Sequence, residues 1–268
     1  MNQTDFLDGH ARAFLKMLDP HANSFYFRKL PDNASSQVSP RNLDGKLKEV
    51  LVQLQRANRA GGGAFVVINE GGHKDGDITR VRAVFADTDG APVEPIIDAL
   101  EPHMVVETSP KKYHVYWLVA DFPLDQFKPV QLAIATQFGT DESVTNLSRV
   151  MRLPGLFHNK NEPVLSRLVN VNWQLPRYTL DEVVMRLSLQ LMPPNQDRQP
   201  SEWNGTGKTD VPPIKEVEKA LTYLNPFVDR ELWFGNILAL AHDYGEGGRD
   251  LAHRWSRGDL WNGERDGA

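Results

Sequence analysis

The sequence predicts an α/β or α+β domain over residues 1–192, a linker over residues 193–213 and a small helical domain over residues 214–268. Two observations lead to this prediction. Strand-like and helix-like segments are interleaved before residue 192, and the strands cluster in the middle, as in mixed catalytic domains. The stretch PPNQDRQPSEWNGTGKTDVPP is polar and rich in proline and glycine, which is typical of a linker, and only helical patterns follow it.

The elements follow from local patterns. The first is an amphipathic helix over Thr4–Leu18, and a strand follows over Ser24–Arg28. Leucines and valine at helical spacing predict a longer helix over Leu43–Ala60, which Gly61–Gly63 would end. Further strands are expected at residues 64–69, 80–86, 104–107, 113–119 and 165–173, with helices at 93–100, where Pro92 lies near the start, at 124–138 and at 180–191. The helical domain is expected to contain helices at 214–224 and 230–244, with another starting near 250–256.

Composition restricts the possible functions. With 268 residues, 40% of them hydrophobic, the chain can bury a core, and the lack of cysteine excludes disulfides, thiolate metal sites and cysteine nucleophiles. The net charge of −5 argues against a protein that merely coats nucleic acid. No apolar run approaches the roughly 20 residues that span a bilayer, and no signal-peptide pattern is present. We therefore expect no membrane partner and a cytoplasmic location.

Two carboxylates lie at the end of a predicted strand, in Val84-Phe85-Ala86-Asp87-Thr88-Asp89-Gly90. Because side chains alternate along a strand, Asp87 and Asp89 should project to the same side, where they repel each other unless a cation lies between them. Oxygen ligands of this kind favour Mg²⁺ or Mn²⁺, and two such ions can act together on one phosphorus. The structural alternative is an aspartate-rich turn.

A second segment, Glu107 to Trp117, combines a hydroxyl, two ammonium groups and an imidazole. A turn carries Ser109, Lys111 and Lys112, and the next strand begins near His114. These groups suit an incoming triphosphate. A hairpin turn with solvated lysines and a packed histidine is the structural alternative.

A third segment, Asp141 to Lys160, contains Arg149 and Arg152 followed by a Pro-Gly turn and Asn159-Lys160. Arginine binds phosphate oxygens through two nitrogens at once, and Lys160 adds a point charge. Asp141 is a candidate for a third carboxylate ligand. The alternative is a set of surface arginines beside a turn.

These three segments, in this order, resemble the motifs of the archaeo-eukaryotic primase superfamily, most closely its plasmid and phage primase-polymerase branch. The resemblance covers about residues 24–173, and residues 214–259 resemble part of the helical primase C-terminal domain. It implies a catalytic core made of an RRM-like sheet and a second α/β subdomain, followed by a small helical domain that continues beyond residue 268. In such proteins a helicase domain often follows, so a helicase domain or partner is expected.

The resemblance also implies roles for single residues. Asp87 and Asp89, with Asp141 as third ligand, would hold two Mg²⁺ or Mn²⁺ ions, and His114 would contact the nucleotide phosphates. Ser109, Lys112, Arg149, Arg152 and Lys160 would complete the nucleotide site. Two positions depart from the family pattern: Lys111 stands where glycine is common, and Asn146 stands where a second acid often follows.

The expected function is therefore DNA-templated transfer of nucleotides from NTPs or dNTPs on a single-stranded DNA template, in plasmid or phage replication in a bacterial or phage-infected host. One alternative is a non-catalytic single-stranded DNA-binding module for replication initiation. The other is a metal-dependent nuclease or phosphohydrolase.

Overall fold

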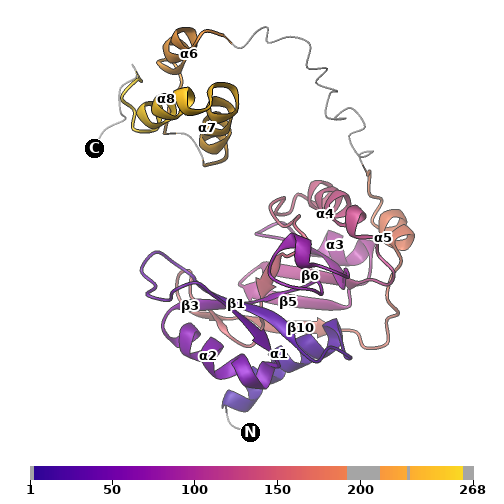
Figure 1. Ribbon diagram of the computed structural model, residues 1–268. Coiled ribbons are helices and arrows are strands. Elements are labelled where there is room, and N and C mark those ends of the chain that lie inside the picture. The colour runs from indigo at the N-terminus through magenta and orange to yellow at the C-terminus, as the bar shows by residue number, and fades with distance from the viewer. Residues whose placement is uncertain (1–2, 192–211, 228–229, 262–268) are drawn as a thin grey trace. The chain divides into compact units, whose positions relative to one another are not determined.

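The computed structural model describes residues 3–191, 212–227 and 230–261 of the chain (Figure 1). By its internal contacts the chain divides into two units, Met1–Asn195 and Gln196–Ala268. Most of the linker predicted at residues 193–213 lies outside the described residues, which include only its last two positions.

Two four-stranded antiparallel sheets form the N-terminal unit. The first has the order β2-β1-β3-β7, with β1 at Phe25–Pro31, β2 at Arg41–Gly45, β3 at Gly62–Val67 and β7 at Val150–Arg152. The second has the order β10-β5-β6-β4, with β4 at Ala83–Asp87, β5 at Met104–Ser109, β6 at Lys112–Leu118 and β10 at Arg167–Val171. A short hairpin pairs β8 (Phe157–His158) with β9 (Val164–Leu165). The predicted α+β class is confirmed.

Helices cover both sheets (Figure 1). Helix α2 (Leu47–Arg59) packs on β3, and α1 (Gln3–Leu18) lies along β10. Helix α4 (Leu124–Phe138) packs on β4, and α3 (Glu94–Ala99) and α5 (Leu180–Arg186) lie near the second sheet. One continuous hydrophobic core joins the two sheets, and its largest fully buried side chains include Phe14, Phe27, Phe85, Tyr116 and Trp117.

The predicted start of the second helix was wrong. Residues 43–45 belong to β2, and Leu43 is buried as a strand residue. Gly45 then turns the chain with a φ of 136°, and the carboxylate of Glu49 accepts the Lys46 N–H at 2.9 Å as α2 begins. The position of Leu43 is compatible with a helix and with a strand. Because Gly45 has a positive φ, the helix cannot continue back through it, and Leu43 belongs to the strand before the turn. Gly62 and Gly63, expected to end the helix, are the first residues of β3.

The C-terminal unit contains α6 (Ile214–Leu221), α7 (Arg230–Tyr244) and α8 (Glu246–Ser256). Its small core includes Leu221, Leu240, Leu251 and Trp255, and the indole N–H of Trp255 donates to the carbonyl of Leu224 at 2.9 Å. None of the described helices has the length and apolar character of a membrane-spanning segment.

Candidate active site

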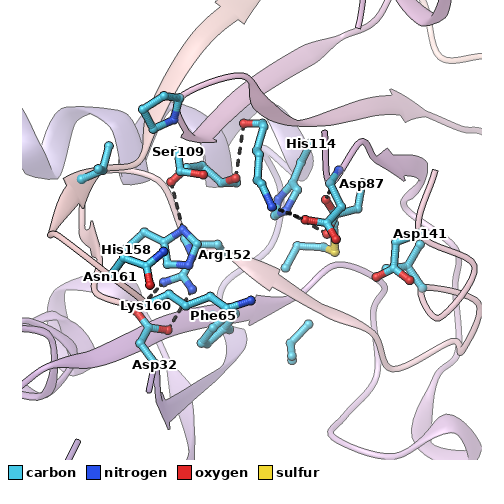
Figure 2. A pocket seen from close by; sticks show the side chains of 18 of the residues that line it. Asp32, Phe65, Asp87, Ser109, His114, Asp141, Arg152, His158, Lys160 and Asn161 are labelled. Carbon is cyan, nitrogen blue, oxygen red and sulfur yellow. Dashed lines mark hydrogen bonds and ion pairs between the residues drawn. The ribbon is translucent and has the colours of Figure 1, made fainter. Parts of the chain in front are cut away.

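A cavity of about 700 Å³ opens between the two sheets of the N-terminal unit, a volume that suits a nucleotide-sized ligand. Residues of all three sequence segments line it, although they come from different strands and loops. The lining includes every predicted site residue, namely Asp87, Asp89, Ser109, Lys112, His114, Asp141, Arg149, Arg152 and Lys160. Figure 2 shows Asp87, His114 and Asp141 on one side of the cavity and Asp32, Phe65, Arg152, His158 and Lys160 on the other.

Asp87 ends β4 directly opposite His114 of β6 in the sheet register. The Oδ2 atom of Asp87 lies 3.4 Å from Nε2 of His114, and the hydroxyl of Tyr116 lies 3.2 Å from Nδ1 of the same ring. Burial by itself raises the pKa of Asp87, but the charge and hydrogen bond of His114 outweigh it, so this pKa lies below its usual value. Burial also raises the pKa of Tyr116 well above its usual value, so its hydroxyl stays protonated. A carboxylate can only accept, so the proton of a neutral His114 belongs on Nε2 and Nδ1 accepts from Tyr116.

The strand that carries Asp87 is an edge strand, and two groups satisfy its free edge. The side chain of Gln131 on α4 bonds both the N–H and the carbonyl of Phe85, at 3.0 and 3.1 Å. The backbone N–H of Asp141 donates to the carbonyl of Asp87 at 3.0 Å. These contacts fix the position of Asp87 and bring the main chain of Asp141 beside it.

Asp89 already has a cationic partner. Its φ of 36° turns it out of the strand, and Nζ of Lys112 lies 2.5 Å from its Oδ1. The hydrogen bond to Asp89 raises the pKa of Lys112. The charge repulsion that the Asp-Thr-Asp sequence suggests is therefore partly relieved by an ammonium group.

The carboxylate of Asp141 accepts hydrogen bonds from its own loop. Ser143 donates to it through both its backbone N–H and its hydroxyl, at 2.8 Å each. Asn146 donates to Asp75 at 3.3 Å, so an acid at position 146 would face another carboxylate. Asp75 also accepts from the backbone N–H and hydroxyl of Ser148, which ties the 75–77 turn to the arginine segment.

Asp87, Asp89 and Asp141 all line the cavity, and carboxylate oxygens are the ligands that Mg²⁺ and Mn²⁺ prefer. Asp87 and Asp141 meet through the backbone, and Asp89 follows Asp87 by two residues. Among residues 3–191, 212–227 and 230–261, no three histidine, aspartate or glutamate side chains are grouped as a metal site. The donor chemistry thus fits divalent ions, and an ion at Asp89 would have to displace the ammonium of Lys112.

Arg149 contributes a guanidinium group to the cavity wall. Its Nε atom is buried and has no hydrogen-bond partner in the part of the chain that the structure describes. Burial lowers its pKa, while the nearby charges of Asp141 and Asp87 act in the opposite direction. A partly buried guanidinium of this kind is suited to bind an anionic ligand.

A tight turn at Pro110-Lys111 joins β5 and β6 and brings Ser109 and Lys112 together as a register pair. Lys111 has a φ of 63°, the left-handed conformation that favours glycine. Lys111 therefore adopts, at some cost in backbone strain, a conformation that glycine would adopt freely.

Sequence reasoning missed several lining residues. Asp32, Phe65, His158 and Asn161 line the cavity, and none belongs to a recognisable local pattern except that His158 directly precedes Asn159-Lys160. Asp32 follows β1, far in sequence from the arginine that it contacts. Only long-range contacts place these residues in the site.

Comparisons with known proteins agree with this architecture. Residues 85–179 match the family model of the RepB DNA-primase N-terminal domain. The AEP domain of the cyanophage S-2L primase-polymerase is similar in structure with a TM-score of 0.56 and 21% identity, over 69% of this chain and 98% of that one. The primase RepB′ is similar with a TM-score of 0.53 and 18% identity, over 94% and 93% of the two chains. No curated protein sequence matched the chain.

The matched residues 85–179 include Asp87, His114 and Arg152, and the fold of the solved structures is that of the two-sheet unit. Residues 85–179 are therefore similar to the RepB DNA-primase N-terminal domain, and the two-sheet unit has the fold of the solved primase-polymerase AEP domain and of the primase RepB′.

Proposed function

We propose that this protein is a DNA primase-polymerase that transfers nucleotides onto a primer or an initiating nucleotide along a single-stranded DNA template. One observation carries the proposal: the carboxylates of Asp87 and Asp89, the imidazole of His114 and the guanidinium of Arg149 line one cavity of nucleotide size. Acids for divalent ions and cations for phosphates are the groups that nucleotidyl transfer requires.

In the proposed reaction, a 3′-hydroxyl oxygen loses its proton to water and forms a bond to the α-phosphorus of an NTP or dNTP, while the bond to the bridging oxygen breaks and pyrophosphate leaves. Asp87 and Asp89, with Asp141, would hold the Mg²⁺ or Mn²⁺ ions, which when bound lower the pKa of the attacking hydroxyl and stabilise charge on the phosphorus oxygens. When Asp87 turns to a metal ion, His114, oriented by Tyr116, would donate its Nε2–H to a phosphate oxygen instead of to Asp87. Ser109, Arg149 and Lys160 would bind the remaining phosphate oxygens.

The template would run past the basic segment between Ser109 and Arg167, which has seven basic and five acidic residues. Its affinity should fall as salt rises because phosphate contacts release counterions. A helicase domain or partner would supply unwound template.

Nucleotide incorporation tests the proposal. Labelled NTPs or dNTPs would be supplied with single-stranded DNA, with and without a primer, in Mg²⁺ and in Mn²⁺. We expect chain extension by the wild type, and loss of extension in Asp87→Asn with DNA affinity retained. DNA binding without any incorporation by the wild type would identify a non-catalytic replication module. Release of mononucleotides or phosphate in place of extension would identify a nuclease or phosphohydrolase.

A further inference from the structure

Four cationic side chains from the predicted set line the cavity, and two of them already have an anionic partner. Lys112 pairs with Asp89, and Arg152 pairs with Asp32. In the described residues, neither Arg149 nor Lys160 forms an ion pair. The four cations are therefore not equivalent toward a triphosphate.

The Arg152–Asp32 pair differs from the exposed Lys112–Asp89 pair because it is buried. The side chains are 9% and 3% exposed, against 42% and 67% for Lys112 and Asp89. Nη1 and Nη2 of Arg152 donate to the two oxygens of Asp32 at 3.0 and 2.8 Å, a two-pronged arrangement that fixes the plane of the guanidinium. The guanidinium lies 4.7 Å from the ring centre of Phe65, its neighbour across the sheet.

The backbone makes room for this pair at Gly63 on β3. A Cβ atom there would lie 2.3 Å from Oδ1 of Asp32 and 2.9 Å from Nη1 of Arg152. Any larger residue would have to displace one of the two partners. Glycine at this position thus accommodates the ion pair and leaves no space for other groups.

Asp32 also holds the β8–β9 hairpin that carries Lys160. Its Oδ2 accepts the backbone N–H of Asn159 at 2.8 Å. The side chain of Asn159 donates to the carbonyls of Asn58 and Gly62 at 3.0 and 2.9 Å. One carboxylate therefore connects the end of β1, the strand β7 and the hairpin loop.

We propose that Asp32 and Arg152 form an electrically neutral brace that positions the β8–β9 hairpin, and that the phosphate charge of the nucleotide is met by Arg149 and Lys160. Arg152 is then a positioning residue that acts through Lys160. The inference rests on the proposed function for its ligand, because it concerns how that same cavity recognises a nucleoside triphosphate. The brace itself stands on contacts that are independent of the function.

Variants of the full chain test the brace through dNTP affinity, measured without template. We expect Asp32→Asn and Arg152→Gln each to weaken dNTP binding roughly tenfold. The double variant should bind no more than about twofold more weakly than either single variant, because both substitutions remove the same ion pair. Arg152→Lys should behave like Arg152→Gln, since lysine keeps the charge and loses the two-pronged contact. In a protein that already carries Lys160→Gln, adding Arg152→Gln should weaken dNTP binding little further.

A direct phosphate contact by Arg152 predicts the opposite pattern. Asp32→Asn would then leave the positive charge of Arg152 without its counter-ion and keep or strengthen dNTP binding. Arg152→Lys would retain most of the affinity, and the losses from Arg152→Gln and Lys160→Gln would add. This pattern would overturn the proposal. Arg80→Gln is the matched control, because Arg80 is exposed and pairs with Asp19 and Glu70 away from the cavity, and this variant should bind dNTP like the wild type.

Amide hydrogen exchange separates the brace from the function and from general unfolding. The Asn159 amide should exchange faster in Asp32→Asn than in wild type, while amides of β4 and β6 keep their protection. An unchanged Asn159 amide would refute the brace even if nucleotides bind. Faster exchange in a protein that binds no dNTP would leave the brace standing and refute the proposed function.

Discussion

The side chain of Gln131 forms hydrogen bonds with the free edge of β4, as a neighbouring strand would, and replacing it should destabilise the strand that carries Asp87. The side chain is fully buried at 0% exposure. Oε1 accepts the Phe85 N–H at 3.0 Å, and Nε2 donates to the carbonyls of Phe85 and Val144 at 3.1 and 3.0 Å. The substitution Gln131→Met keeps the approximate size of the side chain and removes all three bonds.

The magnitude follows from the three backbone groups that would be left buried and unsatisfied. A cost of about 1 kcal/mol for each group, the low end for a buried polar group without a partner, gives a loss of about 3 kcal/mol in the free energy of unfolding. For a unit of this size, that loss corresponds to a fall of roughly 6–12 °C in the Tm of the N-terminal unit. We expect nucleotide incorporation to fall as well, because β4 positions Asp87 against His114.

Hydrogen exchange of peptides from β4 and β6 measures this effect within the N-terminal unit of the full chain, and thermal unfolding gives the Tm. Gln137→Met is the matched control: Gln137 is exposed on the same helix, and its substitution should change stability by less than about 0.5 kcal/mol. Equal protection of β4 in the two variants would show that the Gln131 bonds do not support this edge, and the reasoning would fail.

Three further outcomes are expected. Lys111→Gly should raise the free energy of unfolding by about 0.5–1 kcal/mol in chemical denaturation, because glycine adopts the φ of 63° without strain. His103 is buried, which lowers its pKa to about 4, and its Nδ1 accepts the Leu118 N–H at 3.0 Å. Because the folded pKa lies below the usual 6.5, the stabilisation of the fold by neutral His103 is complete above pH 6.5 and is lost as the pH falls toward 4. The free energy of unfolding should fall by about 2 kcal/mol over this range, after allowance for screening. In unfolding measurements at a series of pH values, His103→Gln should lack this fall. Lys112→Gln should bind Mn²⁺ roughly two- to fivefold more tightly in titrations without nucleotide, because no ammonium competes for Asp89.

Each of these outcomes has a clear contrary result. A Lys111→Gly protein less stable than wild type would mean that the lysine side chain stabilises the turn by more than its backbone strain costs. Parallel pH profiles for wild type and His103→Gln would show that the imidazole titrates normally. Weaker Mn²⁺ binding by Lys112→Gln would mean that the lysine assists the carboxylate site.

Local sequence patterns were sufficient for some of the helices, although the helix predicted at residues 180–191 ends at Arg186. The helix predicted at residues 124–138 has those bounds in the structure, as does the helix at residues 230–244. Helical hydrogen bonds join neighbours four residues apart, so a 15-residue window contains most of the information that they need. Residues 43–45 were misassigned because a five-residue strand depends on its partner β1, which lies elsewhere in the chain. The short strands β7, β8 and β9 escaped prediction for the same reason.

The sequence by itself determined which chemical groups the protein brings to its site: acids after one strand, a hydroxyl, lysines and a histidine at the next turn, and arginines before a Pro-Gly turn. Only the tertiary structure decided how those charges are distributed. In the structure Arg152 pairs with Asp32, 120 residues away, and Lys112 pairs with Asp89, while Arg149 lines the cavity. The physical reason is that the type of a side chain sets its charge, whereas its partner depends on which distant segments the sheets bring within hydrogen-bond distance.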